Sequence, residues 1–141
     1  MEYDPYDLQR FVDAQAPVMP RVEAELRAGR KTSHWMWFVF PQLRGLGRSA
    51  MAERYGIASL DEARAYLAHA VLGQRLRECC SLVLAVQGSS AHEVFGSPDD
   101  SKFRSSLTLF RHAAPDEQLF ADCLRRYYNG VEDTATLALL K

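Results

Sequence analysis

The amino-acid sequence predicts an all-α protein in which residues 1–141 form a single compact domain of about six to eight short helices. Helix-starting residues recur along the chain, and apolar residues follow them at spacings of three and four. No two segments of comparable length suggest paired strands. A chain of 141 residues that is 48% hydrophobic is large enough for one core, and no Pro-, Gly- or Ser-rich linker divides it.

Prolines and a glycine mark the first two predicted helices. Asp4 followed by Pro5 has the pattern of an N-cap and a first helical residue, and the helix would then bury Leu8, Phe11 and Val12. A second helix is expected to begin near Pro20 and to end at Gly29.

Residues 35–40 are ambiguous, because six consecutive apolar residues fit either a buried strand or a buried helix. A lone strand would leave its backbone groups unpaired, and no partner strand is evident. We therefore favour a short helix that Ser33 caps and that ends before Pro41, with the strand as the alternative.

Serine and glutamate place the helices in the middle of the chain. The patterns Ser-Leu-Asp-Glu at residues 59–62 and Ser-Ala-His-Glu at residues 90–93 both fit a capping box. Between them, apolar residues at helical spacing predict a longer helix at about residues 70–87, which Gly88 ends.

The last three helices have similar start signals. Ser97 and Pro98 are expected to open a helix whose apolar face carries Phe103, Leu107 and Phe110. Pro115 is expected to begin the next helix, which Gly130 ends, and Asp133 to cap a final short one.

Composition argues against several classes of partner. Lysine and arginine number 17, and aspartate and glutamate number 18, so the formal net charge is −1. Such a balance argues against binding to nucleic acid or to a membrane surface. No apolar run approaches the roughly 20 residues that cross a bilayer, and the acidic N-terminus is unlike a secretory signal.

The three cysteines suggest no disulfide framework, because their number is odd and two are adjacent. Histidine and cysteine positions also lack metal-ligand spacing. We therefore expect a cytoplasmic protein with reduced, buried cysteines, no metal and no cofactor.

Both tryptophans lie in one short stretch beside a histidine, His34-Trp35-Met36-Trp37. Aromatic side chains most often fill a core, and that is the plainer interpretation here. Side chains of a helix point all round it, however, so His34 and at least one tryptophan are expected to line an edge or a cleft. An indole face beside an imidazole suits a planar ligand such as a nucleobase.

The loop after this stretch supplies Gln42, Arg44 and Arg48 beside two glycines. Arginine side chains match the geometry of phosphate and carboxylate groups, so these residues are candidates for ligand binding. A flexible loop with solvated arginines is the alternative, since the segment fits neither known glycine-rich phosphate motif.

A polar face is predicted near the start of the helix that follows Pro98. Asp99, Lys102 and Ser106 are spaced three and four residues apart, so they share one face of that helix. Helix capping and a weak surface ion pair are the plainer interpretation. Ser105, Ser106 and Thr108 are mediocre helix formers, however, which favours a role in ligand binding.

Three stretches carry a resemblance to a known family: SHWMWFVFPQLRGLGRSAMAERYGI, SLDEARAYLAHAVLGQRLREC and FGSPDDSKFRSSLTLF. With them the chain resembles a bacterial family, domain of unknown function 1810, whose members are sometimes labelled "calpastatin". Members commonly have proline at the position of Ala70 and methionine at that of Leu107. The resemblance implies a compact, mainly helical cytosolic protein and brings no activity with it. A looser likeness to an N-glycosidase family that acts on nucleotide and ADP-ribose compounds is an analogy of fold.

Two functions fit these residues. The first is a small-molecule-binding protein or N-glycosidase-like hydrolase with a nucleotide or ADP-ribose-like ligand. That ligand would stack on a tryptophan, and its phosphates would contact Lys102 or the arginines of residues 42–48. Asp99 would act as general base with His34 assisting. The second function is a non-enzymatic protein-interaction module or homodimer. The first requires His34 and Lys102 to meet at one cavity.

Overall fold

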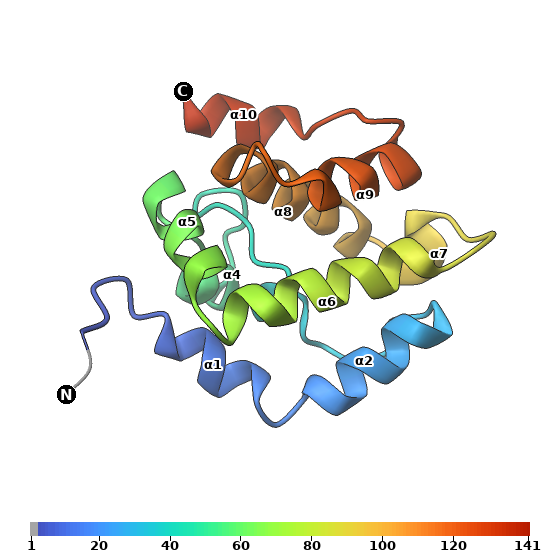
Figure 1. The fold of residues 1–141 in the computed structure, drawn as a ribbon, viewed down its shortest axis with the longest axis horizontal. Helices are drawn as coiled ribbons and strands as arrows, with labels where there is room; N and C mark the ends of the chain where they lie inside the picture. Colours follow the sequence, from blue (N-terminus) through green and yellow to red (C-terminus); the bar gives the residue numbers. More distant parts are fainter. Residues whose placement is uncertain (1–2) are drawn as a thin grey trace.

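Ten α-helices and no β-strand make up residues 3–141, the part of the chain that the computed structural model describes (Figure 1). About 63% of the described residues are helical, which confirms the all-α prediction. Seven of the ten helices have seven or more residues, in agreement with the expected six to eight, and the other three are short turns of four to six residues. In chain order the helices are α1 (Gln9–Gln15), α2 (Met19–Ala28), α3 (Met36–Val39), α4 (Ala50–Tyr55), α5 (Leu60–Ala68), α6 (Leu72–Ala85), α7 (Ala91–Phe95), α8 (Asp99–Ala113), α9 (Gln118–Tyr128) and α10 (Thr134–Leu140).

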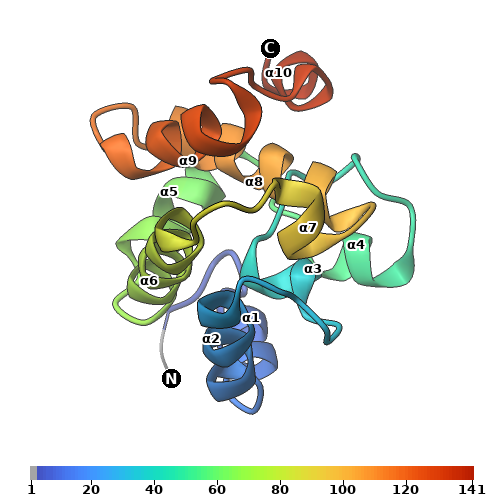
Figure 2. The same cartoon turned by 90° about the vertical axis from the view of Figure 1, so that its right-hand side faces the viewer.

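Two long helices organise the rest. Helix α6 crosses the middle of the molecule and packs against α2, α5 and α9, while α8 packs against α5, α7, α9 and α10 (Figure 1). In the perpendicular view, α5 and α6 lie on one side and α3, α4 and α7 on the other (Figure 2). The start of α8 lies on the same side as α7, against which α8 packs.

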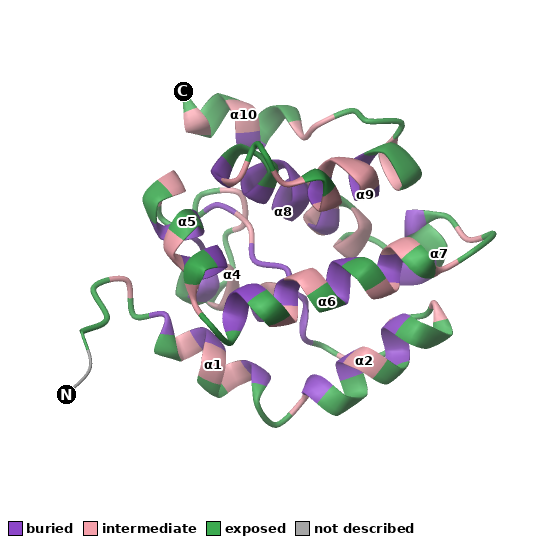
Figure 3. Ribbon diagram, viewed as in Figure 1, coloured by how far each residue is buried: buried purple, intermediate pink, exposed green. Residues whose placement is uncertain are grey.

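Helix α8 enters the core after its first turns, and its middle is buried all round (Figure 3). Every residue from Ser105 to Phe110 is buried. At its first turns, the Phe103 ring lies 4.8 Å from that of Phe40 and 4.7 Å from that of Phe95, centroid to centroid. Aromatic packing thus joins α8 to the segment that ends at Phe40.

The aromatic stretch forms a helix, so the alternative of a strand was wrong. Helix α3 spans Met36–Val39, and the chain leaves it at Phe40, before Pro41 as expected. Ser33 does not cap this helix, because its hydroxyl donates to Glu25 at 2.5 Å. The backbone beyond Pro41 instead forms one isolated bridge, between Leu43 and Ile57.

Three of the predicted caps are confirmed, since the side chains of Ser59, Ser90 and Asp133 each accept a hydrogen bond from a backbone N–H at the start of a helix. Three predicted starts were wrong. Helix α1 begins at Gln9 rather than at Pro5. Residues 4–7 form a turn instead, and the Asp4 carboxylate accepts hydrogen bonds from the backbone N–H groups of Leu8 and Gln9. Helix α8 begins at Asp99, after Pro98, and α9 begins at Gln118 rather than at Pro115.

The three cysteines are buried and form no disulfide. Within residues 3–141, none of the helices combines the length and the apolar character needed to span a bilayer.

Candidate functional site

A hollow of about 290 Å³ lies between residues 31–37 and residues 97–102, where α8 begins. Five residues that the sequence predicts for ligand binding or catalysis line it: His34, Trp35, Trp37, Asp99 and Lys102. Two stretches more than sixty residues apart in the chain therefore meet at one surface, as the ligand-binding hypothesis requires.

The wall formed by residues 31–37 is held in place by a carboxylate from α2. Glu25 Oε1 accepts hydrogen bonds from the backbone N–H groups of Thr32 (2.8 Å) and Ser33 (3.0 Å) and from Trp35 Nε1 (3.0 Å). Its Oε2 accepts from the Ser33 hydroxyl. Burial raises the pKa of the Glu25 carboxyl, but these four hydrogen bonds outweigh burial and lower it to about 2.

The Glu25 contacts can form because α2 ends sharply. Gly29 closes the helix in the left-handed conformation, with a φ of 72° that favours glycine, and the chain turns back along α2. The backbone N–H of Lys31 then donates to Val94 O at 2.7 Å, which ties the wall to α7.

Two lysines converge on Asp99 in this hollow. Lys31 Nζ lies 2.8 Å from Asp99 Oδ2, and Lys102 Nζ lies 3.7 Å from Asp99 Oδ1. The Lys31 side chain is only 7% exposed, so its ion pair is shielded from solvent. Two positive charges face one negative charge, and the α8 N-terminus adds its positive end. Among the residues that line the hollow, the two lysines thus outnumber the one carboxylate, while the Glu25 carboxylate lies behind the wall.

The two tryptophans have different surroundings. Trp35 is fully buried, with its indole N–H on Glu25 and Lys31 Nζ 5.0 Å from the ring centroid, so it has no free face for stacking. Trp37 is half-buried, and Lys102 Nζ lies 5.2 Å from its ring centroid. Of the two, Trp37 is the ring that a ligand in the hollow can reach.

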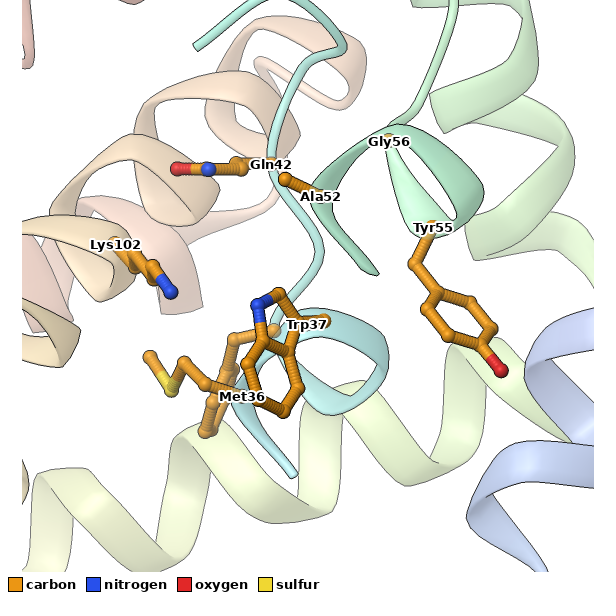
Figure 4. A pocket seen from close by; sticks show the side chains of 8 residues that line it. Met36, Trp37, Gln42, Ala52, Tyr55, Gly56 and Lys102 are labelled. Atoms are coloured by element: carbon orange, nitrogen blue, oxygen red, sulfur yellow. The ribbon is translucent and has the colours of Figure 1, made fainter. Parts of the chain in front are cut away.

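A second, much smaller gap lies on the other side of Trp37, and Figure 4 shows the side chains around it. Gln42, Ala52 and Tyr55 line this gap together with Trp37 and Lys102. Its volume of about 10 Å³ is at the lower limit for one water molecule, so the gap is too small for a ligand. Gln42 thus adjoins the Trp37 ring without lining the larger hollow.

The remaining candidates do not line the hollow. Arg44 lines a different one, and Arg48 is exposed on the loop before α4. The hydroxyls of Ser105 and Thr108 donate to the backbone carbonyls one turn earlier in α8, at 3.1 and 2.9 Å. Ser106 is 1% exposed, and its hydroxyl finds no hydrogen-bond partner within residues 3–141. The predicted polar face of α8 therefore ends at Lys102, because the helix enters the core beyond it.

Lys31 was missing from the candidates that the sequence suggested. Its signal was present: the chain has only three lysines against 14 arginines, and two of the three border the aromatic and the Ser-Pro-Asp-Asp stretches. Residues 3–141 bring together no group of three or more His, Cys, Asp or Glu side chains that could hold a metal ion.

Residues 5–140 match the model of a family described as "Protein of unknown function (DUF1810)". The chain belongs to this family. The crystal structure of the conserved hypothetical protein Rv1873 from Mycobacterium tuberculosis is 62% identical to it, with a TM-score of 0.96, over 97% of this chain and 98% of that one. No curated protein matches the chain significantly. Membership of DUF1810 therefore supports the fold, and the argument for a function has to come from the site.

Proposed function

We propose that this DUF1810 protein binds a small planar molecule that carries an anionic group, of the nucleotide class, in the hollow between residues 31–37 and the start of α8. The observation that carries this proposal is the pair of lysines that converge on Asp99 beside the half-buried Trp37. An interaction module would need no such hollow beside its aromatic segment.

The charges of the hollow favour an anion. Lys31 and Lys102 share one carboxylate, so an incoming phosphate or carboxylate gains a lysine contact without displacing Asp99 entirely. Charge-assisted hydrogen bonds of this kind are about twice as strong as those between neutral groups. His34, which is exposed at the rim, supplies a further donor when protonated.

The volume of the hollow and the single accessible indole ring favour a mononucleotide over a larger ligand such as ADP-ribose. A volume of about 290 Å³ is just below the range for ligand sites, which begins at about 300 Å³. A base that replaces Lys102 over Trp37 would stack on the indole face. A mononucleotide is then expected to fit, and ADP-ribose to extend beyond the hollow toward the solvent.

Hydrolysis is the finer form of the proposal. In an N-glycosidase reaction, Asp99 would accept a proton from the water that attacks the anomeric carbon, and His34 would donate one to the departing base. Because both Asp99 oxygens face a lysine, ligand phosphate has to draw at least one lysine away before Asp99 acts as a base.

Binding is tested by titrating the protein with AMP and with ADP-ribose while tryptophan fluorescence is recorded. We expect saturable quenching of Trp37, with AMP bound at least as tightly as ADP-ribose. The variant Lys102→Gln is expected to raise the Kd at least tenfold, about 1.4 kcal/mol. Lys141→Gln, which removes the same charge at an exposed site, should leave it unchanged.

The proposal is wrong if neither ligand quenches saturably, or if both lysine variants behave alike. Release of free base, followed by chromatography, tests the hydrolase separately. Asp99→Asn should lower the rate of base release by a larger factor than it raises the Kd. If the unaltered protein binds the ligand and releases no base, the protein is a binding protein and not a hydrolase.

A further inference from the structure

A second hollow, of about 470 Å³, lies between the start of α1 and the segment that follows α4. Three arginines line it together with two carboxylates: Arg10, Arg44, Arg54, Asp7 and Glu62. We propose that this hollow is an oxyanion site, which binds the phosphate or carboxylate group of a small molecule through Arg44 and Arg54. It is separate from the site beside Trp37 and does not depend on the function proposed there.

Arg10 forms the floor of this hollow and has no donor left for a ligand. Its five N–H directions are used by one carboxylate and four backbone carbonyls: those of Glu62 and of Tyr6, Asp7, Arg54 and Gly56. The Glu62 side chain is 3% exposed, and its other oxygen accepts from the backbone N–H of Ala58 at 3.0 Å. Glu62 therefore neutralises Arg10 and no further cation.

Arg44 brings a second guanidinium to the same place. Its Nη2 donates to Gly56 O at 3.1 Å, and Arg10 Nη2 donates to that same oxygen at 3.1 Å. Two atoms that each lie 3.1 Å from one oxygen are at most about 6 Å apart, which is well inside the Debye length at physiological salt. The structure thus holds two like charges close together, and the one buried carboxylate beside them pairs with Arg10.

Arg54 adds a third guanidinium without an acidic partner. It lies 5.5 Å from the centroid of the Tyr55 ring and makes no ion pair within the described part of the chain. Asp7, exposed on the opposite wall, is the one other acid that lines the hollow. Three positive charges against two negative ones leave a net positive site.

An oxyanion would relieve the repulsion and use the free donors. Arg44 donates one N–H to Gly56 O, and its other N–H groups have no partner in the described residues. The guanidinium groups of the exposed Arg44 and Arg54 can each donate two parallel hydrogen bonds to a phosphate or a carboxylate. Arg10 and the Glu62 contacts hold the backbone of residues 54–58 in position, and Gly56 O in turn holds one N–H of Arg44, so the Arg44 guanidinium is positioned before a ligand arrives.

The test uses the full chain and two simple anions, inorganic phosphate and succinate, with ionic strength held constant by sodium chloride. Calorimetry and the NMR signals of the arginine Nε–Hε groups report binding. We expect saturable binding of at least one anion, with the signals of Arg44 and Arg54 shifted. Preference for phosphate or for succinate identifies the oxyanion geometry that the site takes.

The variant Arg44→Gln/Arg54→Gln is expected to raise the Kd at least tenfold. Arg21→Gln/Arg30→Gln is the matched control, since it removes the same charge from two exposed arginines outside the hollow and should change the Kd less than twofold. If both double variants weaken binding equally, or if neither anion binds saturably, the proposal fails. It also fails if binding follows Lys102→Gln instead. If Arg44→Gln/Arg54→Gln does not fold, the Nε–Hε signals of the unaltered protein provide the test. Anion binding that leaves the signals of Arg44 and Arg54 unshifted would then refute the proposal.

Discussion

Replacing Glu25 by glutamine should remove much of the acid sensitivity of this protein. The Glu25 carboxylate is 9% exposed and accepts four hydrogen bonds from the segment that lines the proposed ligand site. Glutamine keeps one of the two oxygens and nearly the same shape, but it has no charge that titrates.

The size of the effect follows from the pKa of the carboxyl, which is about 2 in the folded protein against an ordinary value of 4.5. Each pKa unit corresponds to about 1.4 kcal/mol, so the folded state gains about 3 kcal/mol at neutral pH from the ionised form. A folded-state pKa that is lowered gives stability that is present above pH 4.5 and lost as the pH falls toward 2. About 2 kcal/mol should be lost by pH 3, a large fraction of the 5–15 kcal/mol typical of a domain.

Urea unfolding curves at several pH values between 3 and 7, followed by circular dichroism, measure this loss. We expect Glu25→Gln to be less stable than the parent protein at pH 7, and the difference to shrink by about 2 kcal/mol at pH 3. Glu23→Gln is the control on the same helix, because Glu23 accepts no hydrogen bond in the described part of the chain. A gap between parent and Glu25→Gln that stays constant with pH would refute the reasoning.

Two further substitutions test the packing around the site. Ser106→Ala removes a buried hydroxyl without a hydrogen-bond partner in residues 3–141, so it should leave stability unchanged or raise it by up to about 1 kcal/mol, as urea unfolding would measure. A loss of more than that amount would mean that the hydroxyl has a partner. Gly73→Ala places a methyl group 2.1 Å from the backbone oxygen of Leu67, so α5 and α6 must separate, and we expect a loss of at least about 2 kcal/mol. A normal melting temperature for that variant would contradict the close approach of the two helices.

Local signals predicted the fold well where the capping group and its helix are adjacent in sequence. Ser59, Ser90 and Asp133 cap the helices that they precede, and Gly29 closes α2. The start of α1 was predicted too early, because the Asp4 carboxylate reaches across a turn to the N–H groups of residues 8 and 9. A capping group and the helix it caps need not be neighbours, and sequence patterns assume that they are.

The hydroxyl residues of α8 have a structural role that their sequence does not reveal. Ser105, Ser106 and Thr108 were predicted to bind a ligand because they are mediocre helix formers, yet the Ser105 and Thr108 hydroxyls donate to carbonyls of their own helix. A hydroxyl that is satisfied in this way can be buried at little cost. Residues 105–110 of α8 can therefore be buried on all sides although three of them carry hydroxyls.

The candidate site was chosen from the clustering of aromatic and charged residues, and the lining residue that the sequence missed depends on contacts between distant segments. The sequence placed His34, Trp37, Asp99 and Lys102 in two stretches, and both stretches border one hollow. Lys31 escaped notice because it stands alone in a polar loop, and its ion pair with Asp99 exists only once α2, α7 and α8 have packed.

Both hollows depend on a buried carboxylate, and this shared arrangement explains how loops can form rigid walls in so small a helical protein. Glu25 on α2 accepts hydrogen bonds from the backbone of residues 32 and 33, and Glu62 on α5 accepts from Ala58 and from Arg10. Each carboxylate satisfies N–H groups that no helix can satisfy, since they lie in segments between helices. A hydrophobic residue at either position would suit the core but would leave those donors unpaired, at a cost of about 1–3 kcal/mol for each buried donor. Carboxylates at inward-facing helical positions thus hold the segments between helices that carry Lys31 and Arg44 to the two hollows.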